Sequence, residues 1–142
     1  MTRDCVVDSS VVIKLFVPED LTGAAEKLLR KDSSRRFFVP DLLYSECTNI
    51  LWKYVRRFGY RTEKAYEDLT ELMHMDLSPV STANIFFDSL AFALNYGITA
   101  YDASYVTLAL QKEVPFVTAD RKLIGKLRGS GTDICWLGDL SF

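Results

Sequence analysis

Short runs of apolar residues alternate along the chain with longer segments in which apolar residues recur every three or four positions. The short runs predict β-strands and the longer segments predict amphipathic helices. The expected strands are Asp4–Asp8, Phe37–Val39, Leu77–Val80, Phe116–Thr118 and Ile134–Trp136. The expected helices are Ser9–Phe16, Leu21–Lys31, Asp41–Phe58, Glu63–Met75, Asn84–Tyr96, Tyr101–Glu113 and Arg121–Arg128. Strands that alternate with helices favour an α/β domain with a mostly parallel central sheet.

The composition is that of a globular domain. With 142 residues, 49% of them apolar and 25% charged, the chain is expected to form a single domain over residues 1–142 with a proper core. A net charge of −2 gives no general attraction for nucleic acid. The stretch from Ile85 to Ile98 is the most apolar, but it is too short and too polar to span a bilayer, so we expect no membrane segment.

The few thiols and the single imidazole exclude two kinds of site. Cys5, Cys47 and Cys135 are odd in number and far apart, and His74 is the only histidine. This pattern argues against a structural zinc site and against a disulfide framework. Reduced thiols and the lack of a signal-peptide pattern predict a cytoplasmic protein.

Four acids stand at junctions between the predicted elements. Asp8 and Asp120 close apolar strands, Glu46 lies early in the helix after Pro40, and Asp102 lies in the first turn of another helix. Ligands bind parallel sheets at the carboxyl ends of the strands, so the four could converge at one edge. Carboxylates packed together repel each other, and a divalent cation is the usual remedy. The sequence therefore predicts an acidic metal site.

Each acid also has a purely structural interpretation. Asp8 and Asp120 could cap the helices that follow them, and Asp102 fits the last position of a capping box that begins at Thr99. Glu46 could pair with a surface lysine or arginine. For one acid alone the structural interpretation is favoured, whereas the joint placement of all four favours the metal site.

Four motifs in order resemble those of PIN-domain ribonucleases, most closely the VapC-type toxins of toxin–antitoxin pairs. The resemblance covers nearly the whole chain. The motifs are Val6-Val7-Asp8-Ser9-Ser10, Val39-Pro40-Asp41-Leu42-Leu43-Tyr44-Ser45-Glu46, Thr99-Ala100-Tyr101-Asp102-Ala103-Ser104-Tyr105 and Phe116-Val117-Thr118-Ala119-Asp120-Arg121-Lys122-Leu123. The resemblance implies a three-layer α/β/α sandwich around about five short strands.

The resemblance further implies RNA hydrolysis that depends on one or two Mg²⁺ or Mn²⁺ ions and leaves a 5′-phosphate. Asp8, Glu46 and Asp102 match the family's metal-binding acids, and Asp120 matches a fourth, more loosely placed one. Ser9 and Thr118 match hydroxyl positions beside the acids, although Ser9 could simply be a helix cap. A homodimer and a cognate antitoxin protein are also implied.

Positive charge for binding RNA is less evident in the sequence. Arg121 and Lys122, which directly follow Asp120, and Lys14 are the candidates, against the alternative that they are solvated surface charges. Aromatic residues at helix positions are expected in the core or in a dimer contact rather than in base stacking. The residues with this expectation are Trp52, Tyr54, Phe58 and Tyr60. A second group is expected in the core, namely Phe86, Phe87, Phe92 and Tyr96.

Other functions remain open. A phosphatase or a phosphorylated receiver domain would need further acids beside Asp8, and Ser10 and the strand Cys5–Val7 do not supply them. The serious rival is a PIN-like module that has lost its activity and only binds a partner. A housekeeping or structure-specific nuclease is the other alternative.

Overall fold

Five short parallel strands form the centre of the protein. The computed structural model describes residues 4–31 and 34–140. The strands are β1 (Cys5–Val7), β2 (Phe37–Pro40), β3 (Ser78–Val80), β4 (Phe116–Thr118) and β5 (Ile134–Trp136), in the spatial order β3-β2-β1-β4-β5. All neighbouring pairs are parallel. The predicted α/β class and the five strands are therefore confirmed.

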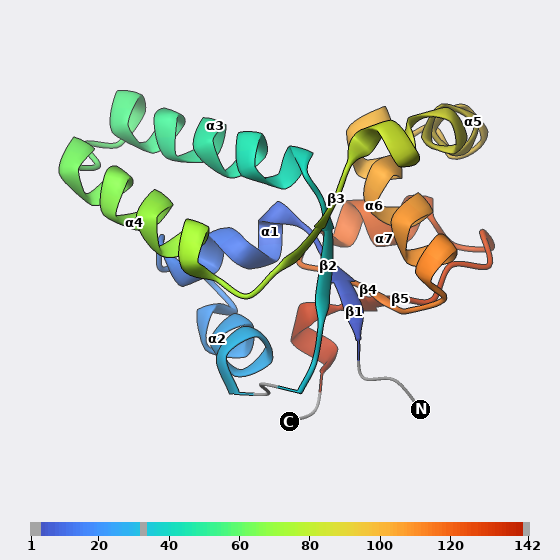
Figure 1. Ribbon diagram of the computed structural model, residues 1–142, viewed down its shortest axis with the longest axis horizontal. Helices are drawn as coiled ribbons and strands as arrows, with labels where there is room; N and C mark the ends of the chain where they lie inside the picture. The colour runs from blue at the N-terminus through green and yellow to red at the C-terminus, as the bar shows by residue number, and fades with distance from the viewer. Residues whose placement is uncertain (1–3, 32–33, 141–142) are drawn as a thin grey trace.

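Helices cover both faces of this sheet, as Figure 1 shows. One face carries α1 (Ser9–Val12), the 3₁₀ turn η1 (Ile13–Leu15), α2 (Thr22–Lys31), α3 (Leu42–Arg57) and α4 (Thr62–His74). The other carries α5 (Phe86–Tyr96), α6 (Ala100–Lys112) and α7 (Arg121–Lys126). Two further 3₁₀ turns, η2 (Thr82–Asn84) and η3 (Leu137–Asp139), complete the elements. The three-layer sandwich expected from the resemblance is confirmed.

The order in which the chain fills the sheet changes direction at its centre, where β1 pairs directly with β4. From β1 the chain moves outward through β2 to β3, then returns to the other side of β1 to form β4 and β5. The order of strands thus reverses between β1 and β4. Loops that leave the carboxyl ends of these two strands turn toward opposite faces and open a crevice between them. Asp8 and Asp120 follow these two strands.

The expected helix boundaries are close, with two instructive differences. The predicted helix Ser9–Phe16 divides into α1 and η1, and the predicted helix Asn84–Tyr96 starts at Phe86 after the turn η2. By contrast, α6 begins at its predicted cap, since the Thr99 hydroxyl accepts a hydrogen bond from the Asp102 N–H at 3.1 Å. It ends at Glu113, which has a positive φ of 56° and stops the helix in a left-handed conformation.

The core lies between the sheet and its covering helices. All three residues of β1 are fully buried, and α6 buries an unbroken run from Ala103 to Ala109. An amphipathic helix buries only one stripe, so α6 is a central helix with neighbours on most sides. One neighbour is α5, which packs against it and shields it from solvent.

The prediction that Phe86 and Phe87 lie in the core is wrong. They are 65% and 81% exposed, because α5 turns its small residues Ser89 and Ala93 toward the interior. Small side chains let α5 approach α6 closely and leave the large apolar ones on the outer face. Phe92 and Tyr96 are half-buried and pack ring against ring, with centroids 4.6 Å apart.

The first aromatic group also divides. Trp52 and Phe58 are exposed, whereas Tyr54 and Tyr60 are partly buried against the core. Cys5, Cys47 and Cys135 are all free thiols. No helix within the described ranges is long and apolar enough to cross a membrane.

Candidate active site

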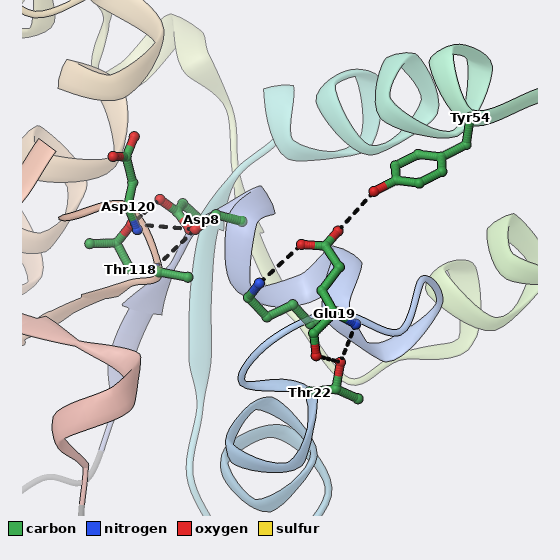
Figure 2. A network of polar contacts seen from close by, with 9 residues as sticks. Asp8, Glu19, Thr22, Tyr54, Thr118 and Asp120 are labelled. Carbon is green, nitrogen blue, oxygen red and sulfur yellow. Dashed lines mark hydrogen bonds and ion pairs between the residues drawn. The ribbon is translucent and has the colours of Figure 1, made fainter. Parts of the chain in front are cut away.

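Asp8 is a buried carboxylate held by two hydroxyl groups. It follows β1 and is only 6% exposed. The Ser10 hydroxyl donates to Asp8 Oδ1 at 2.5 Å, and the Thr118 hydroxyl at the end of β4 donates to Oδ2 at 2.6 Å. Figure 2 shows Asp8 and Thr118 side by side with Asp120 next to them. Both carboxylate oxygens are therefore fixed by hydroxyl groups at the carboxyl ends of the paired strands β1 and β4.

Ser10, rather than the expected Ser9, is the serine that supports Asp8. Its Oγ also accepts a hydrogen bond from the Ala119 N–H at 3.0 Å and lies 3.4 Å from Thr118 Oγ1. Thr118 Oγ1 in turn accepts the Asp120 N–H at 3.1 Å. Ser9 is half-buried and contributes none of these bonds. Two adjacent serines carry the same signal in the sequence, so only the direction of the first helical turn distinguishes them.

Asp120 lies beside this pair and caps α7. Its Oδ1 accepts the N–H groups of Lys122 and Leu123 at 3.0 and 3.2 Å, which confirms the cap that was the alternative interpretation. Asp8, in contrast, makes no side-chain cap bond to α1. Asp120 is exposed, so its second oxygen faces solvent at the rim of the site.

Glu46 reaches the site from α3 on the other side of the sheet. Its Oε1 accepts a hydrogen bond from the Tyr105 hydroxyl of α6 at 2.5 Å. It forms no ion pair within the described parts of the chain, so the alternative pairing with a surface cation is absent there. The sequence identifies Tyr105 only as a residue on the buried face of its helix. No sequence signal separates a buried tyrosine that holds a catalytic acid from an ordinary core aromatic.

Asp102 interacts electrostatically with each of the other three acids. Burial raises its pKa, and the charge of Asp120 raises it further, while Thr99 and Lys126 lower it. Burial raises the pKa of Asp8 to about 6, opposed by the hydroxyls of Ser10 and Thr118, and Asp102 adds to the increase. Burial also raises the pKa of Glu46, again with a contribution from Asp102. The carboxylates are thus near enough to disfavour each other's ionised forms.

The donor set fits a hard divalent cation. It consists of carboxylate and hydroxyl oxygens, and neither histidine nor thiolate contributes, which matches Mg²⁺ or Mn²⁺ rather than zinc. Across residues 4–31 and 34–140, no three acids, cysteines or histidines are close enough together to share one ion directly. Mg²⁺ commonly binds through one or two carboxylates and keeps several water molecules, so such spacing suits it.

The basic candidates differ in their surroundings. Lys14 is buried, 8% exposed, and its Nζ pairs with Glu19 at 3.2 Å, which does not support a contact with RNA. Glu19 also accepts the Tyr54 hydroxyl at 3.1 Å, as Figure 2 shows. Arg121 is exposed and stacks on the Trp136 ring, with Cζ 3.6 Å from the centroid.

Two further lysines complete the basic residues of α7. Lys122 is exposed, which fits a phosphate contact and the alternative of a solvated surface charge equally well. Lys126 was not among the candidates from the sequence, yet it is the cation that acts on Asp102. Its place four residues after Lys122 on a short helix is the only signal that could have indicated it.

A cavity of about 370 Å³ lies away from these acids. It is lined by α2, the end of α4 and the start of β2, with Leu29, Phe37 and His74 among its residues. The His74 ring nitrogen Nδ1 bonds to the Thr70 carbonyl at 2.8 Å. The cavity contains none of the four acids; Glu46 and Asp102 are half-buried and Asp120 is exposed, so solvent reaches the acidic edge of the sheet.

Comparison with known proteins agrees with this geometry. The family model of the PIN domain matches residues 5–127, which is most of the chain. The chain belongs to the PIN-domain family. Ribonuclease VapC3 of Pyrobaculum aerophilum is 37% identical over 123 residues, covering 85% of this chain and 92% of the relative.

Solved structures share the fold. A crystal structure of a Pyrobaculum aerophilum protein matches with a TM-score of 0.70 and 23% identity, covering 95% of this chain and 84% of that one. A toxin–antitoxin complex from Klebsiella pneumoniae matches with a TM-score of 0.66 and 14% identity, covering 92% and 95%. The chain therefore has the PIN fold, and Asp8, Glu46, Asp102 and Asp120 all lie within the residues that the family model matches.

Proposed function

We propose that this chain, as a single PIN domain, is an endoribonuclease that hydrolyses RNA phosphodiester bonds with Mg²⁺ or Mn²⁺ and serves as the toxin of a toxin–antitoxin pair. The observation that carries the proposal is Asp8, buried between two hydroxyls at the carboxyl ends of β1 and β4, with Asp102 near enough to raise its pKa and with Glu46 and Asp120 interacting with Asp102 in turn. The family and the identity to a ribonuclease support the reaction class.

Asp8, Glu46 and Asp102, with Asp120 at the rim, would hold one ion or two, each ion bound directly by one or two of these carboxylates and by the others through its water molecules. When bound, such an ion polarises a phosphoryl oxygen, activates water and stabilises the leaving oxygen of an in-line displacement. Ser10 and Thr118 keep the Asp8 oxygens in fixed positions, which spares the site the entropy of ordering them. The open edge suits a polymer, which could not enter a closed pocket.

RNA phosphates need positive charge beside the acids. Arg121 and Lys122 begin α7 directly after Asp120 and are exposed, so they are the proposed phosphate contacts. The Arg121 guanidinium lies over the Trp136 ring, which reduces its freedom before RNA arrives. Lys14 is left out of this proposal because it is buried and its ammonium group pairs with Glu19.

The direct test is cleavage of a mixed cellular RNA pool by purified protein with Mg²⁺, with Mn²⁺ and with EDTA. Asp8→Asn, purified in the same way, controls for contaminating nucleases, and Asp20→Asn at an exposed turn controls for the loss of any carboxylate. We expect discrete cuts that need metal, persist in Asp20→Asn and disappear in Asp8→Asn. No cleavage by the folded wild type would reject the nuclease and favour the inactive binding module.

The mapped products decide between a toxin and a housekeeping nuclease. Cuts confined to one or a few RNA sites, and growth arrest when the wild type but not Asp8→Asn is expressed, are expected of a toxin. Broad processing without arrest would favour the housekeeping role. A cognate antitoxin is expected to suppress both effects on co-expression, with a basic side chain placed against the acids.

We also propose a homodimer that forms through the exposed apolar surface of α5 and the start of α6. This surface, here called the α5 face, consists of Phe86, Phe87, Leu90, Leu94 and Tyr101, which are 57–81% exposed. Together they offer on the order of 600 Å² of apolar area, close to the ~800 Å² that one partner contributes to a standard interface. Asp88 is the only charged residue of α5, so two copies can meet with little charge repulsion.

Light scattering over a concentration series tests the dimer. Phe87→Glu is expected to give a monomer, whereas Met73→Glu on α4, which is 70% exposed, is expected to leave the dimer intact. A wild type that remains monomeric at every concentration would reject this proposal without affecting the nuclease.

A further inference from the structure

Tyr105 is a buried phenol in direct contact with one of the four acids. It lies in α6, one turn after Asp102, and is only 1% exposed. Its hydroxyl donates to Glu46 Oε1 at 2.5 Å. Helices α3 and α6 lie on opposite faces of the sheet in Figure 1, so this bond crosses the edge at which the acids gather.

The phenol has little freedom to move. Its ring stacks on Phe116 of β4, with centroids 6.0 Å apart and planes inclined by 10°. The neighbouring residues of α6, Ala103 to Ala109, are all buried around it. A hydroxyl carried on a ring packed in this way occupies one place, set by the sheet and by α6 together.

Glu46, in contrast, carries its carboxylate on a long side chain at a half-buried position. Without a partner it would be free to turn away from the other acids, and the charge of Asp102 would favour that movement. The bond to Tyr105 fixes Oε1, while Oε2 takes no other hydrogen bond within the described parts of the chain. One helix thus carries both an acid, Asp102, and the group that fixes the distance of a second acid from it.

We propose that Tyr105 is a positioning residue for the metal site: it holds Glu46 through Oε1 and leaves Oε2 to bind the divalent cation. This inference rests on the proposed metal dependence. Groups that orient metal ligands from behind commonly contribute 10- to 100-fold to metal affinity. The alternative is that the bond serves only to join α3 to α6.

The test is Mn²⁺ binding to the RNA-free protein, measured by electron paramagnetic resonance. Tyr105→Phe removes the hydroxyl and keeps the ring. We expect it to raise the Kd for Mn²⁺ about 10-fold or more, and to raise the Mn²⁺ concentration for half-maximal cleavage equally, while the rate at saturating Mn²⁺ and the KM for RNA stay within about 3-fold of wild type.

Tyr54→Phe is the matched control. It also removes a phenol that donates to a glutamate, Glu19, from α3, but at a place remote from the acids. Its Mn²⁺ Kd is expected to equal that of the wild type. The double variant Tyr105→Phe/Glu46→Gln is expected to bind Mn²⁺ no more weakly than Glu46→Gln alone, because Tyr105 acts through Glu46.

The outcomes separate this inference from the function on which it rests. Tyr105→Phe with lowered thermal stability but a wild-type Kd for Mn²⁺ would overturn the positioning role and leave the metal site standing. A further loss of affinity in the double variant would also overturn it. A wild type that binds no Mn²⁺ would overturn both proposals. Weakened Mn²⁺ binding in Tyr105→Phe supports the inference even if the protein cuts no RNA.

Discussion

Replacing Asp8 by asparagine should change the pH dependence of stability in the metal-free protein. Burial raises the pKa of Asp8 from 3.8 to about 6. The unfolded chain therefore loses this proton near pH 4, whereas the folded protein keeps it until about pH 6. Between these values the folded state binds more protons, so its stability falls as the pH rises.

The magnitude follows from the two pKa values. The difference between 3.8 and about 6 corresponds to about 3 kcal/mol at 1.36 kcal/mol per pKa unit. This contribution is present below pH 4 and lost by pH 7. The Asp8→Asn variant has no carboxyl group to ionise, so it would not lose this stability as the pH rises. Its amide would, however, face a hydroxyl that donates to the carboxylate in the wild type, and the lost hydrogen bond costs about 1 kcal/mol. The variant should therefore be less stable than wild type at pH 4 and more stable at pH 7.

The assay is urea denaturation in EDTA from pH 4 to pH 7, on wild type, Asp8→Asn and Asp20→Asn. We expect the free energy of unfolding of Asp8→Asn minus that of wild type to rise by about 2.4 kcal/mol over this range, because the unfolded carboxyl is already half ionised at pH 4, and the corresponding difference for Asp20→Asn to stay flat. Excess Mg²⁺ at pH 7 should stabilise the wild type, by about 2.7 kcal/mol at 100 times its Kd, but not Asp8→Asn. A flat difference for Asp8→Asn would refute the claim that burial controls this carboxyl.

Three further outcomes follow from contacts around the site and in the helical layer beside it. Ser10→Ala should lower the free energy of unfolding by about 2 kcal/mol and the rate of RNA cleavage about 10-fold. Ser9→Ala should change the free energy of unfolding by less than about 0.5 kcal/mol. Denaturation and cleavage assays on the same samples measure both quantities. Asp68→Asn should weaken the bond from Tyr60 and the ion pair of this fully buried acid, lowering the Tm by roughly 5 °C with an unchanged Mn²⁺ Kd. Arg121→Gln should reduce the salt dependence of RNA binding, measured by fluorescence anisotropy, by about one unit in the log–log slope.

The strands were predictable because their sequence signal is local. Phe116–Thr118 and Ile134–Trp136 were placed at their observed bounds, since each is a short apolar run between residues that stop a strand. The acids at the ends of β1 and β4 were predictable for the same reason. Their proximity then follows from parallel topology, in which the carboxyl ends of adjacent strands share an edge.

The supporting hydroxyls and the surface of α5 were not predictable in the same way. Ser9 and Ser10 are chemically identical, and a rotation of about 100° per helical residue decides which one faces Asp8. Phe86 and Phe87 are large apolar residues of a mostly apolar helix, which predicts a core position, but hydrophobicity alone does not tell which side of α5 packs. Only the close approach of Ser89 and Ala93 to the interior resolves that choice.

The groups that hydrogen-bond to the side chains of Asp8 and Glu46 are neutral, and Lys126, which lowers the pKa of Asp102, forms no ion pair with it among the described residues. Ser10 and Thr118 hold Asp8, and Tyr105 holds Glu46, without adding positive charge. Elsewhere in the described chain acids are satisfied by cations, as Asp68 is by Lys64. An arginine or lysine on the site acids would compete with a metal for every carboxylate oxygen. Neutral donors fix the geometry and leave the negative charge intact, so the site attracts an external cation, either a divalent metal or the basic side chain of an inhibiting partner.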